Sequence, residues 1–229
     1  QASNMQPHNL IINGAMTVAQ RGTSVAGYSS GNGYQTCDRW KTSPVTSGTF
    51  TVSQATDAPE GFYNSYKWEC TASATLSASS NAGISQLLEG QNLQMLKKGT
   101  SNAVPLTASF WVKSNKLGTY ILEIVDADNS RSISKSYTIS SSGVWEYKTI
   151  TFAGDTTGTL NSDNEQSIRA TFWLAAGSDY TSGTLATSWE TATSANRAVG
   201  QIHIGDTVSN YFQITGVQLE VGSTASSFA

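Results

Sequence analysis

Two apolar segments at opposite ends of the chain constrain the fold more than any other feature. The first spans residues 9–16 (NLIINGAM) and the second residues 212–221 (FQITGVQLEV). Each is typical of a strand that is buried on at least one face. Short strands and polar turns fill the sequence between them. We therefore expect a β-sandwich in which the first and last strands are adjacent in one sheet.

The length of 229 residues fits one large β domain. No Pro-rich linker and no internal repeat divides the chain. We assign residues 1–8 to a leader or linker, residues 9–222 to the sandwich domain and residues 223–229 to a C-terminal tail. The chain begins with Gln1 rather than Met, which indicates a fragment or a processed product.

Charge is sparse in this sequence. Charged residues make up 13% of the chain, against about 25% in an average domain, and the net charge is −3. No Lys/Arg run is longer than the pair Lys97-Lys98, so neither nucleic acid nor another polyanion is an expected partner. No apolar run approaches the ~18 residues that span a bilayer, so no membrane partner is expected.

The middle of the chain alternates with a period of two, as strands do. Residues 107–113 and 119–125 flank a Gly-closed loop and read as a hairpin. Further strands are expected at residues 132–139, 145–152 and 168–175. Residues 83–98 leave two alternatives open: one helix, or a strand at 83–88 followed by a helical turn at 90–97.

We expect a set of large apolar side chains to form the core, with Trp111 and Trp173 buried mid-strand as well. The set is Leu10, Ile12, Met16, Phe110, Val112, Ile121, Ile124, Phe172, Leu174, Val217 and Leu219. Cys37 and Cys70 can be either buried free thiols or one disulfide, because spacing alone does not decide.

Nucleophilic catalysis is difficult to build from these residues. The chain has two histidines, His8 in the polar leader and His203 in an alternating apolar segment, and no Gly-x-Ser-x-Gly elbow. We therefore expect His203 to be structural or exposed, and we predict no catalytic residues. Glycoside hydrolysis needs only two facing carboxylates and is kept as an alternative. Its candidates are Asp38, Glu69, Glu89, Glu123 and Asp126.

Metal and cofactor sites are not predicted. Two Cys and two His, widely separated, make a zinc site improbable. The series Asp126-x-Asp128-x-Ser130 resembles the start of a calcium loop, but Arg131 replaces the required Gly and Tyr137 replaces the required Glu. We interpret it as an Asx-rich turn. No phosphate-binding Gly loop is present either.

Aromatic residues are frequent, with six Trp and nine Tyr. Sugar rings stack on aromatic planes while amides and charged groups bind their hydroxyls, so a sugar site needs both on the surface. The long irregular stretch 177–200 and the segment 34–40 both contain this combination. The predicted glycan-binding residues are Trp189, Tyr180, Asn196 and Arg197, with Tyr34 and Trp40 as a second cluster.

Several segments spread from residue 9 to residue 222 resemble a module of tail-fibre and other virion proteins of marine tailed phages, notably those of cyanobacteria. They are residues 9–23 (NLIINGAMTVAQRGT), 38–40 (DRW), 109–114 (SFWVKS), 173–177 (WLAAG), 195–197 (ANR) and 216–222 (GVQLEVG). The resemblance implies a virion location. It does not name a ligand.

A more distant similarity is to jelly-roll carbohydrate-binding modules, which also open with an Asn-Leu-x-x-Asn-Gly strand and close with a Val-x-Leu-Glu strand. Those modules often hold a structural calcium through acids at both termini. Thr17, Thr215 and Gly216 stand at the corresponding positions here, so the calcium site is not carried over. The fold expected is a single all-β antiparallel jelly-roll sandwich.

The leading hypothesis is a non-enzymatic phage virion domain that adheres to host-surface glycan at a fibre tip. Its further partners would be other virion proteins and copies of itself, as a trimer by analogy with fibres. One alternative is a capsid decoration or tail structural protein without glycan binding. A second alternative is a polysaccharide hydrolase or lyase.

Overall fold

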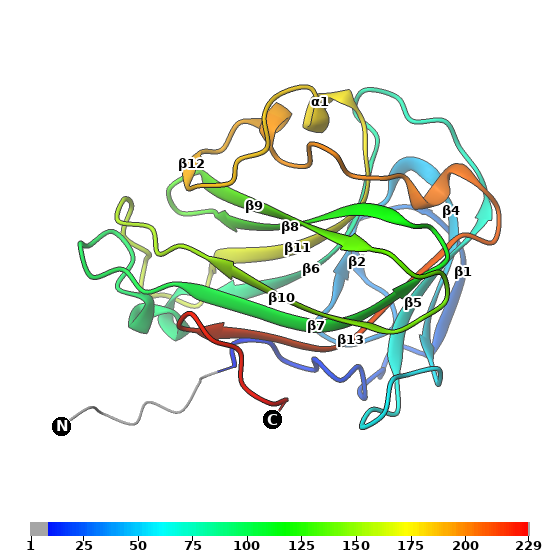
Figure 1. Cartoon of the computed structure of the whole chain (residues 1–229), viewed down its shortest axis with the longest axis horizontal. Coiled ribbons are helices and arrows are strands. Elements are labelled where there is room, and N and C mark those ends of the chain that lie inside the picture. The colour runs from blue at the N-terminus through cyan, green and yellow to red at the C-terminus, as the bar shows by residue number, and fades with distance from the viewer. Residues whose placement is uncertain (1–8, 229) are drawn as a thin grey trace.

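The computed structural model describes residues 9–228, and its strands lie in two layers (Figure 1). One layer has the strand order β5-β13-β7-β10 and the other β6-β11-β8-β9, with every neighbouring pair antiparallel. The strands of the two layers are β5 Ser65–Ala72, β6 Asn81–Glu89, β7 Leu106–Ser114, β8 Gly118–Asp126, β9 Arg131–Ile139, β10 Glu146–Phe152, β11 Gln166–Ala176 and β13 Tyr211–Val221.

The path of the chain makes this sandwich a jelly roll. Each of the connections β5 to β6, β7 to β8 and β9 to β10 carries the chain from one layer to the other. Alternation between two four-stranded sheets in this order is the jelly-roll arrangement, as expected from the sequence. Strand β4 Val45–Ala55 pairs with β5 and, at Val45, with β6, so it joins the two layers at one side. The remaining strands extend the edges: β1 Ser24–Ser30, β2 Gly33–Tyr34, β3 Lys41–Thr42 and β12 Glu190–Thr191.

The two ends of the domain are adjacent, but residues 9–16 are not the regular strand that we predicted. They join β13 through one bridge between Asn9 and Glu220 and through the Leu10 amide, which donates to the Leu219 carbonyl at 2.8 Å. Positive φ values of 58° at Asn13 and Met16 interrupt the extended backbone. The predicted leader, residues 1–8, lies outside the described residues.

The irregular backbone displaces one predicted core residue. Ile12 is 52% exposed, whereas Ile11 is buried, and the other ten side chains of that set are buried. The Gln86 side chain holds the segment in place, because it accepts a hydrogen bond from the Ile12 amide and donates one to the Ile12 carbonyl. Trp111, also predicted to be buried, is only half-buried and packs against Tyr147 of β10 on the outer face of β7.

The hairpin predicted for residues 107–125 is also wrong. β7 pairs with β13 and β10, whereas β8 pairs with β9 and β11, so the short loop between them crosses from one layer to the other. Of the two alternatives for residues 83–98, the second is correct. Strand β6 is followed by two short 3-10 helices, Gly90–Asn92 and Gln94–Leu96.

Aromatic side chains pack between the two layers. Phe110 of β7 contacts Phe172 of β11 edge-on, with ring centroids 5.0 Å apart, and contacts Tyr137 of β9 at 5.1 Å. Tyr120 of β8 meets Phe212 of β13 at 5.4 Å. Such aromatic pairs add to the stabilisation that burial of the rings provides.

Residues 177–200 cover the outer face of β8 and β9 and include helix α1 Ser178–Thr181 and the 3-10 helix Ser194–Asn196 (Figure 1). The Ser134 amide of β9 donates to the Ala186 carbonyl at 2.7 Å, which attaches this segment to the sheet. The segment reaches Trp173 of β11 through Tyr180 and Arg197, and a polar cleft remains beside it on β11 and β6. Within residues 9–228, no helix has the length and apolarity to cross a membrane, and no cluster of three metal-ligating side chains is found.

Candidate functional site

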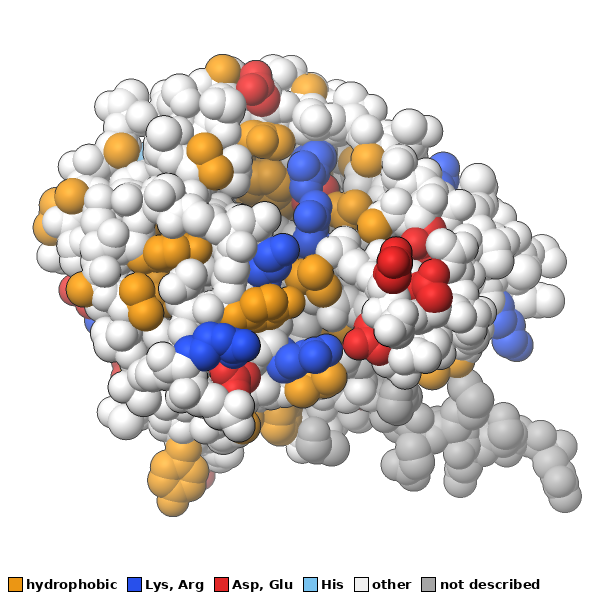
Figure 2. Space-filling view, turned by 180° about the vertical axis from the view of Figure 1, so that it is seen from behind, with side chains coloured by type: hydrophobic (Ala, Val, Ile, Leu, Met, Phe, Trp, Pro, Cys, Tyr) orange, Lys and Arg blue, Asp and Glu red, His pale blue; other side chains and the backbone are white. Residues whose placement is uncertain are grey.

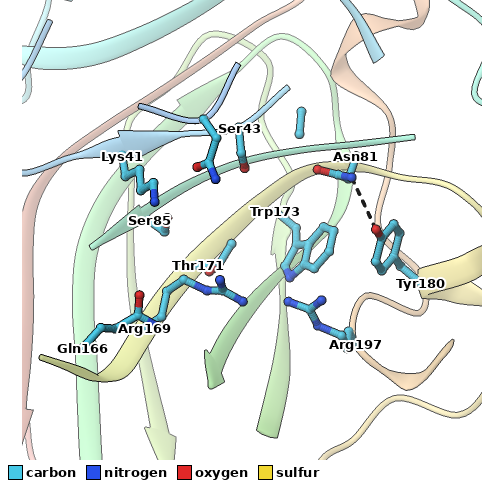
Figure 3. A pocket seen from close by; sticks show the side chains of 13 residues that line it. Lys41, Ser43, Asn81, Ser85, Gln166, Arg169, Thr171, Trp173, Tyr180 and Arg197 are labelled. Atoms are coloured by element: carbon cyan, nitrogen blue, oxygen red, sulfur yellow. Dashed lines mark hydrogen bonds between the residues drawn. The ribbon is translucent and has the colours of Figure 1, made fainter. Parts of the chain in front are cut away.

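A polar cleft lies on the outer face of β6 and β11, beside the segment that covers β8 and β9 (Figure 3). Figure 2, the view from behind, shows Lys and Arg side chains gathered in the middle of one face with hydrophobic side chains beside them. The side chains on which the site depends are Lys41, Asn81, Ser85, Arg169, Thr171, Trp173, Tyr180 and Arg197.

Strand register places four polar side chains in a row across this face. Lys41 of β3 is opposite Ser85 of β6, Ser85 is opposite Thr171 of β11, and Thr171 is opposite Glu123 of β8. Side chains opposite one another on neighbouring strands lie about 4.5–5.5 Å apart at Cβ. The row therefore brings residues from four strands to one site.

Glu123 ends this row as a fully buried carboxylate whose oxygens are both bound. Arg197 donates to it through Nε at 2.6 Å and through Nη2 at 2.9 Å, and Trp173 Nε1 donates at 3.0 Å. Burial alone would lower the pKa of Arg197, but the hydrogen bonds and the charge of Glu123 raise it overall. This bidentate pair fixes the loop carrying Arg197 against β8.

Arg169 and Thr171 carry buried polar atoms that no other described residue satisfies. Arg169 Nε and Thr171 Oγ1 are both shielded from solvent and have no hydrogen-bond partner within residues 9–228. Burial lowers the pKa of Arg169, and the nearby charge of Arg197 lowers it further against the attraction of Glu123. An arginine stays protonated at neutral pH, so a half-buried positive charge faces this cleft.

Aromatic rings form one wall of the cleft. Trp173 of β11 and Tyr180 of α1 have ring centroids 5.3 Å apart, and the Arg197 guanidinium lies over both rings. The Tyr180 hydroxyl accepts a hydrogen bond from the Asn81 side chain at 3.5 Å. Gly83, opposite Trp173, leaves room for the Thr171 side chain, because a Cβ at residue 83 would lie 3.1 Å from Thr171 Cγ2.

Two of the six predicted glycan-binding residues, Tyr180 and Arg197, meet in this cleft. Asn196 lies next to them in sequence, but its side chain binds the Thr184 amide at 3.0 Å and Glu190 at 2.8 Å. Its contacts are therefore those of a residue that shapes the loop.

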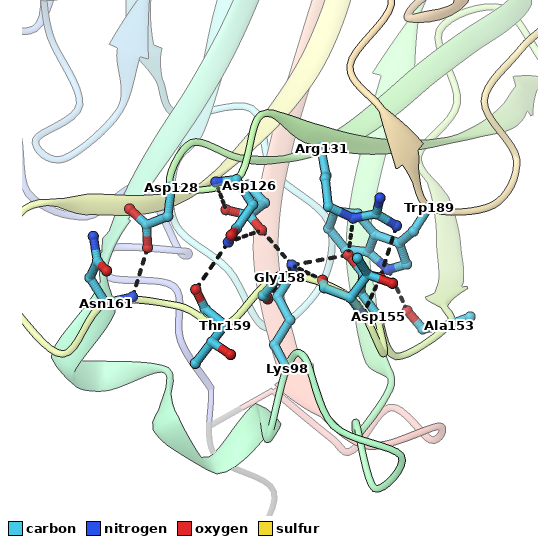
Figure 4. A network of polar contacts seen from close by, with 12 residues as sticks. Lys98, Asp126, Asp128, Arg131, Ala153, Asp155, Gly158, Thr159, Asn161 and Trp189 are labelled. Atoms are coloured by element: carbon cyan, nitrogen blue, oxygen red, sulfur yellow. Dashed lines mark hydrogen bonds and ion pairs between the residues drawn. The ribbon is translucent and has the colours of Figure 1, made fainter.

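Trp189 belongs to the covering segment but lies away from the cleft, beside a polar network that includes Arg131 and Asp155 (Figure 4). Its Nε1 donates to the Ala153 carbonyl at 2.7 Å, and its ring packs against the Lys98 ammonium at 5.2 Å. Lys98 is buried and binds both Asp126 and Asp155, and Arg131 binds Asp155 bidentately. Trp189 thus covers a buried ion-pair cluster.

The second predicted cluster is divided between surface and core. Tyr34 is 39% exposed and is opposite Lys41 across β2 and β3, at the border of the cleft. Trp40 is fully buried, and its Nε1 donates to the Asn13 carbonyl at 3.0 Å. A side chain in that position has no surface with which to contact a ligand, so Trp40 is left out of the site proposed below.

Four residues of the cleft were not predicted from the sequence: Lys41, Asn81, Arg169 and Thr171. One usable signal was present, because the alternation of residues 168–175 puts Arg169, Thr171 and Trp173 on one face. Trp173 is buried as predicted, with an exposed fraction of 5%. It is buried on the outer face beside the cleft, however, and not between the two layers.

Two other sequence interpretations concern polar turns and a histidine. The Asp126 carboxylate accepts a hydrogen bond from the Asn129 amide at 3.0 Å, so the apparent calcium loop is an Asx turn. His203 Nδ1 accepts from the Gly205 amide, and Nε2 lies 2.8 Å from the Ala74 carbonyl. The ring is therefore a neutral Nε2–H tautomer that ties together two loops, which confirms its structural role.

Comparisons with known proteins show a similarity in fold alone. No protein-family model and no curated protein matches the sequence. Similar solved structures include the enzymatically active domain of tailspike protein 4 from bacteriophage CBA120, at 12% identity and a TM-score of 0.49. The match covers 93% of this chain and 21% of that one.

Carbohydrate-binding modules are also among the similar structures. TmCBM61 in complex with β-1,4-galactotriose matches at 14% identity and a TM-score of 0.43, over 93% of this chain and 97% of that one. The family 11 module of Clostridium thermocellum Lic26A-Cel5E matches at 13% identity and a TM-score of 0.44, over 87% and 99%. At such identities no residue roles are transferred, and function has to be argued from the cleft itself.

Proposed function

We propose that this chain is a non-catalytic glycan-binding domain and that its ligand occupies the cleft on β6 and β11. The observation that carries the proposal is the pair of unsatisfied polar atoms there, Arg169 Nε and Thr171 Oγ1. Buried polar groups in proteins nearly always have a hydrogen-bond partner. A ligand rich in hydroxyl groups supplies such partners at a place where the protein does not.

The other residues of the cleft suit a sugar. Asn81, Ser43 and Ser85 offer donors and acceptors for hydroxyl groups, and the partly exposed Tyr180 ring offers a face for the C–H side of a pyranose. None of the described residues that line the cleft is an Asp or a Glu, and Glu123 lies beneath it, bound by Arg197. Because glycoside hydrolysis uses two carboxylates facing the sugar, the proposal is binding without cleavage.

The biological setting proposed is a phage virion, in a tail fibre or receptor-binding position, with host-surface glycan as the ligand. The support is the sequence resemblance to virion modules, which covers segments from residue 9 to residue 222. A fibre that carries several copies of the domain, as a homo-oligomer joined to other virion proteins, gains avidity from weak individual sites.

The test is a binding screen of the purified domain, presented multivalently, against host polysaccharides and a glycan array. Tyr180→Ala removes the aromatic wall, and Tyr63→Ala is the matched control, because Tyr63 is 87% exposed and lies outside the cleft. We expect saturable binding by the wild type and by Tyr63→Ala, and loss of binding by Tyr180→Ala at an unchanged fold.

Two results would overturn the proposal. Absence of saturable binding to every glycan, with a normally folded domain, would favour a purely structural virion role. Release of reducing sugar from a bound polysaccharide would instead identify an enzyme.

A further inference from the structure

We propose that the cleft selects acidic glycans and that Lys41 and Arg169 hold the anionic group of the sugar, a carboxylate or a sulfate ester. This inference rests on the proposed function and adds a ligand chemistry to it. It differs from the expectation drawn from the sequence, in which no basic cluster was visible and no polyanion was expected to bind.

Lys41 and Arg169 lack the ion pairs that most Lys and Arg side chains of this chain form. Eight of the thirteen Lys and Arg side chains form ion pairs with Asp or Glu. Within residues 9–228, no carboxylate lies within ion-pairing distance of Lys41 or Arg169, although both are partly buried and both line the same cleft. Unpaired cations are common at an exposed surface, but burial makes them costly.

The carboxylate at the end of the polar row, Glu123, is fully engaged. Glu123 is bound by two nitrogens of Arg197 and by Trp173 Nε1, so it neutralises Arg197 and leaves Arg169 without a salt bridge. In Figure 3 the guanidinium groups of Arg169 and Arg197 point into the same space beside Trp173. Two converging guanidinium groups repel each other, and Glu123 forms an ion pair with Arg197 while it attracts Arg169 only from beyond ion-pairing distance.

Hydrogen-bond donors lie side by side around the space that the two guanidinium groups share. Thr171 Oγ1 is buried without a partner, and Ser85 lies in register between Thr171 and Lys41. The row therefore offers hydroxyl and cationic donors side by side, with Arg169 at the next outward position of β11. Ionised acceptors form stronger hydrogen bonds with such donors than neutral sugar hydroxyls do.

The net negative charge of the chain opposes nonspecific binding of polyanions. The net charge is −3, so a polyanion is repelled by the molecule as a whole and attracted at the cleft. Long-range attraction of the kind that drives nucleic-acid binding is therefore absent. A single acidic substituent that reaches Lys41 and Arg169 is what the local charges fit.

The experiment compares acidic polysaccharides with chemically matched neutral forms. One arm uses a uronic-acid polysaccharide and its carboxyl-reduced form, and the other uses a sulfated galactan and its desulfated form. We expect at least one acidic form to bind more than tenfold tighter than its neutral partner, with weaker binding at high salt. The arm that shows the difference identifies the group as carboxylate or sulfate.

Charge-removing variants locate the effect. Lys41→Gln and Arg169→Gln should each reduce binding of the acidic form several-fold more than binding of its neutral partner. Lys97→Gln is the matched control, because Lys97 is an exposed lysine without an ion pair outside the cleft. Melting curves identify any variant that fails to fold, and Arg169→Met, which keeps a long side chain without the charge, then replaces Arg169→Gln as the test of this position.

The outcomes separate this inference from the proposed function. Equal binding of acidic and neutral forms, unaffected by Lys41→Gln and Arg169→Gln, overturns the acidic preference and leaves glycan binding intact. An equal loss in Lys97→Gln also overturns it, because the effect is then nonspecific charge. If no polysaccharide of either kind binds, both the inference and the proposed function fail.

Discussion

Arg197 donates two hydrogen bonds, of 2.6 and 2.9 Å, to Glu123, which lies 74 residues earlier in the sequence. Glu123 is fully buried in β8, and Arg197 belongs to the segment that covers β8 and β9. The pair fastens that segment to the sheet and holds the wall formed by Trp173 and Tyr180, since the guanidinium also lies over both rings. The wall of the cleft therefore depends on one ion pair.

Arg197→Met should lower the free energy of unfolding by about 3–5 kcal/mol, because it leaves a buried carboxylate without its partner. Arg21→Met is a useful control, since Arg21 also pairs with a carboxylate, Asp38, at 2.9 Å, but its side chain is mostly exposed. There the expected loss is under about 1 kcal/mol. Urea unfolding measures both, and similar losses in the two variants would contradict the buried-pair explanation.

Thr171→Val should separate binding from stability. The substitution removes a buried hydroxyl that has no partner in the described residues, so the free energy of unfolding should stay constant or rise by about 1 kcal/mol. Binding to the glycan identified in the screen should fall, because Thr171 lines the cleft and its hydroxyl is a proposed partner of the ligand.

The matched control for this prediction is Thr107→Val. Thr107 is also buried, but its hydroxyl donates to the Gly222 carbonyl at 2.7 Å. Its loss should cost about 1–3 kcal/mol and leave binding unchanged. A stability loss in Thr171→Val as large as that in Thr107→Val would mean that the Thr171 hydroxyl is satisfied in solution.

Much of the fold could be predicted because strand periodicity is a local property. Alternation located β9 and β11 well, and the apolar terminal segments correctly predicted adjacent ends. The hairpin between β7 and β8 was mispredicted because a short Gly-closed loop is compatible with a tight turn and with a crossover between layers. Which of these forms is decided by pairing with β13 and β9, and such distant partners are not visible in a local pattern.

The cleft was harder to predict because its residues come together only in the folded chain. Lys41, Arg169 and Arg197 lie far apart in the sequence, and none of them is in a basic run. The position of Tyr180 and Arg197 in one long irregular segment could be read, and both line the cleft. Trp189 is in the same segment, but its contacts with Ala153 and Lys98 depend on the register of β12 against β9.

Asp155 should give the domain a measurable acid sensitivity. Burial by itself raises the pKa of Asp155, but hydrogen bonds from Arg131 and Lys98 lower it overall (Figure 4). A carboxyl whose pKa is lower in the folded state binds fewer protons there than in the unfolded chain, so it stabilises the fold above its unfolded pKa, near 4. That stabilisation is lost as the pH falls from about 4 through the lowered folded value.

Urea midpoints measured from pH 6 down to pH 2 check this prediction. Asp155→Asn should lower the midpoint at pH 6 and flatten its decline in acid. Glu60→Gln, at an exposed carboxylate without an ion pair, should follow the wild type. An unchanged acid slope in Asp155→Asn would exclude Asp155 as a source of the pH dependence.

Cys37 and Cys70 should be unreactive in the folded domain. Both are buried free thiols, and burial raises the pKa of Cys37 to about 12. Because the thiolate is the reactive form, a thiol reagent at pH 8 should modify neither residue until the chain is unfolded. Mass spectrometry counts the modified thiols before and after denaturation, and a native mass lower by two hydrogens would reveal a disulfide instead.

Ser85→Asp should occupy the cleft with an anion that belongs to the protein itself. Ser85 is opposite Lys41 on one side and opposite Thr171 on the other, so a carboxylate here lies among the groups assigned to the acidic substituent. Opposite charges directly across two strands attract, so the melting temperature should hold or rise slightly. Acidic glycan binding should be lost by competition and repulsion.

Ser85→Asn has nearly the same size without the charge, and it should retain most of the binding. Equal loss in both variants would mean that the cleft is closed by bulk rather than by charge, and would argue against an anion between Lys41 and Arg169.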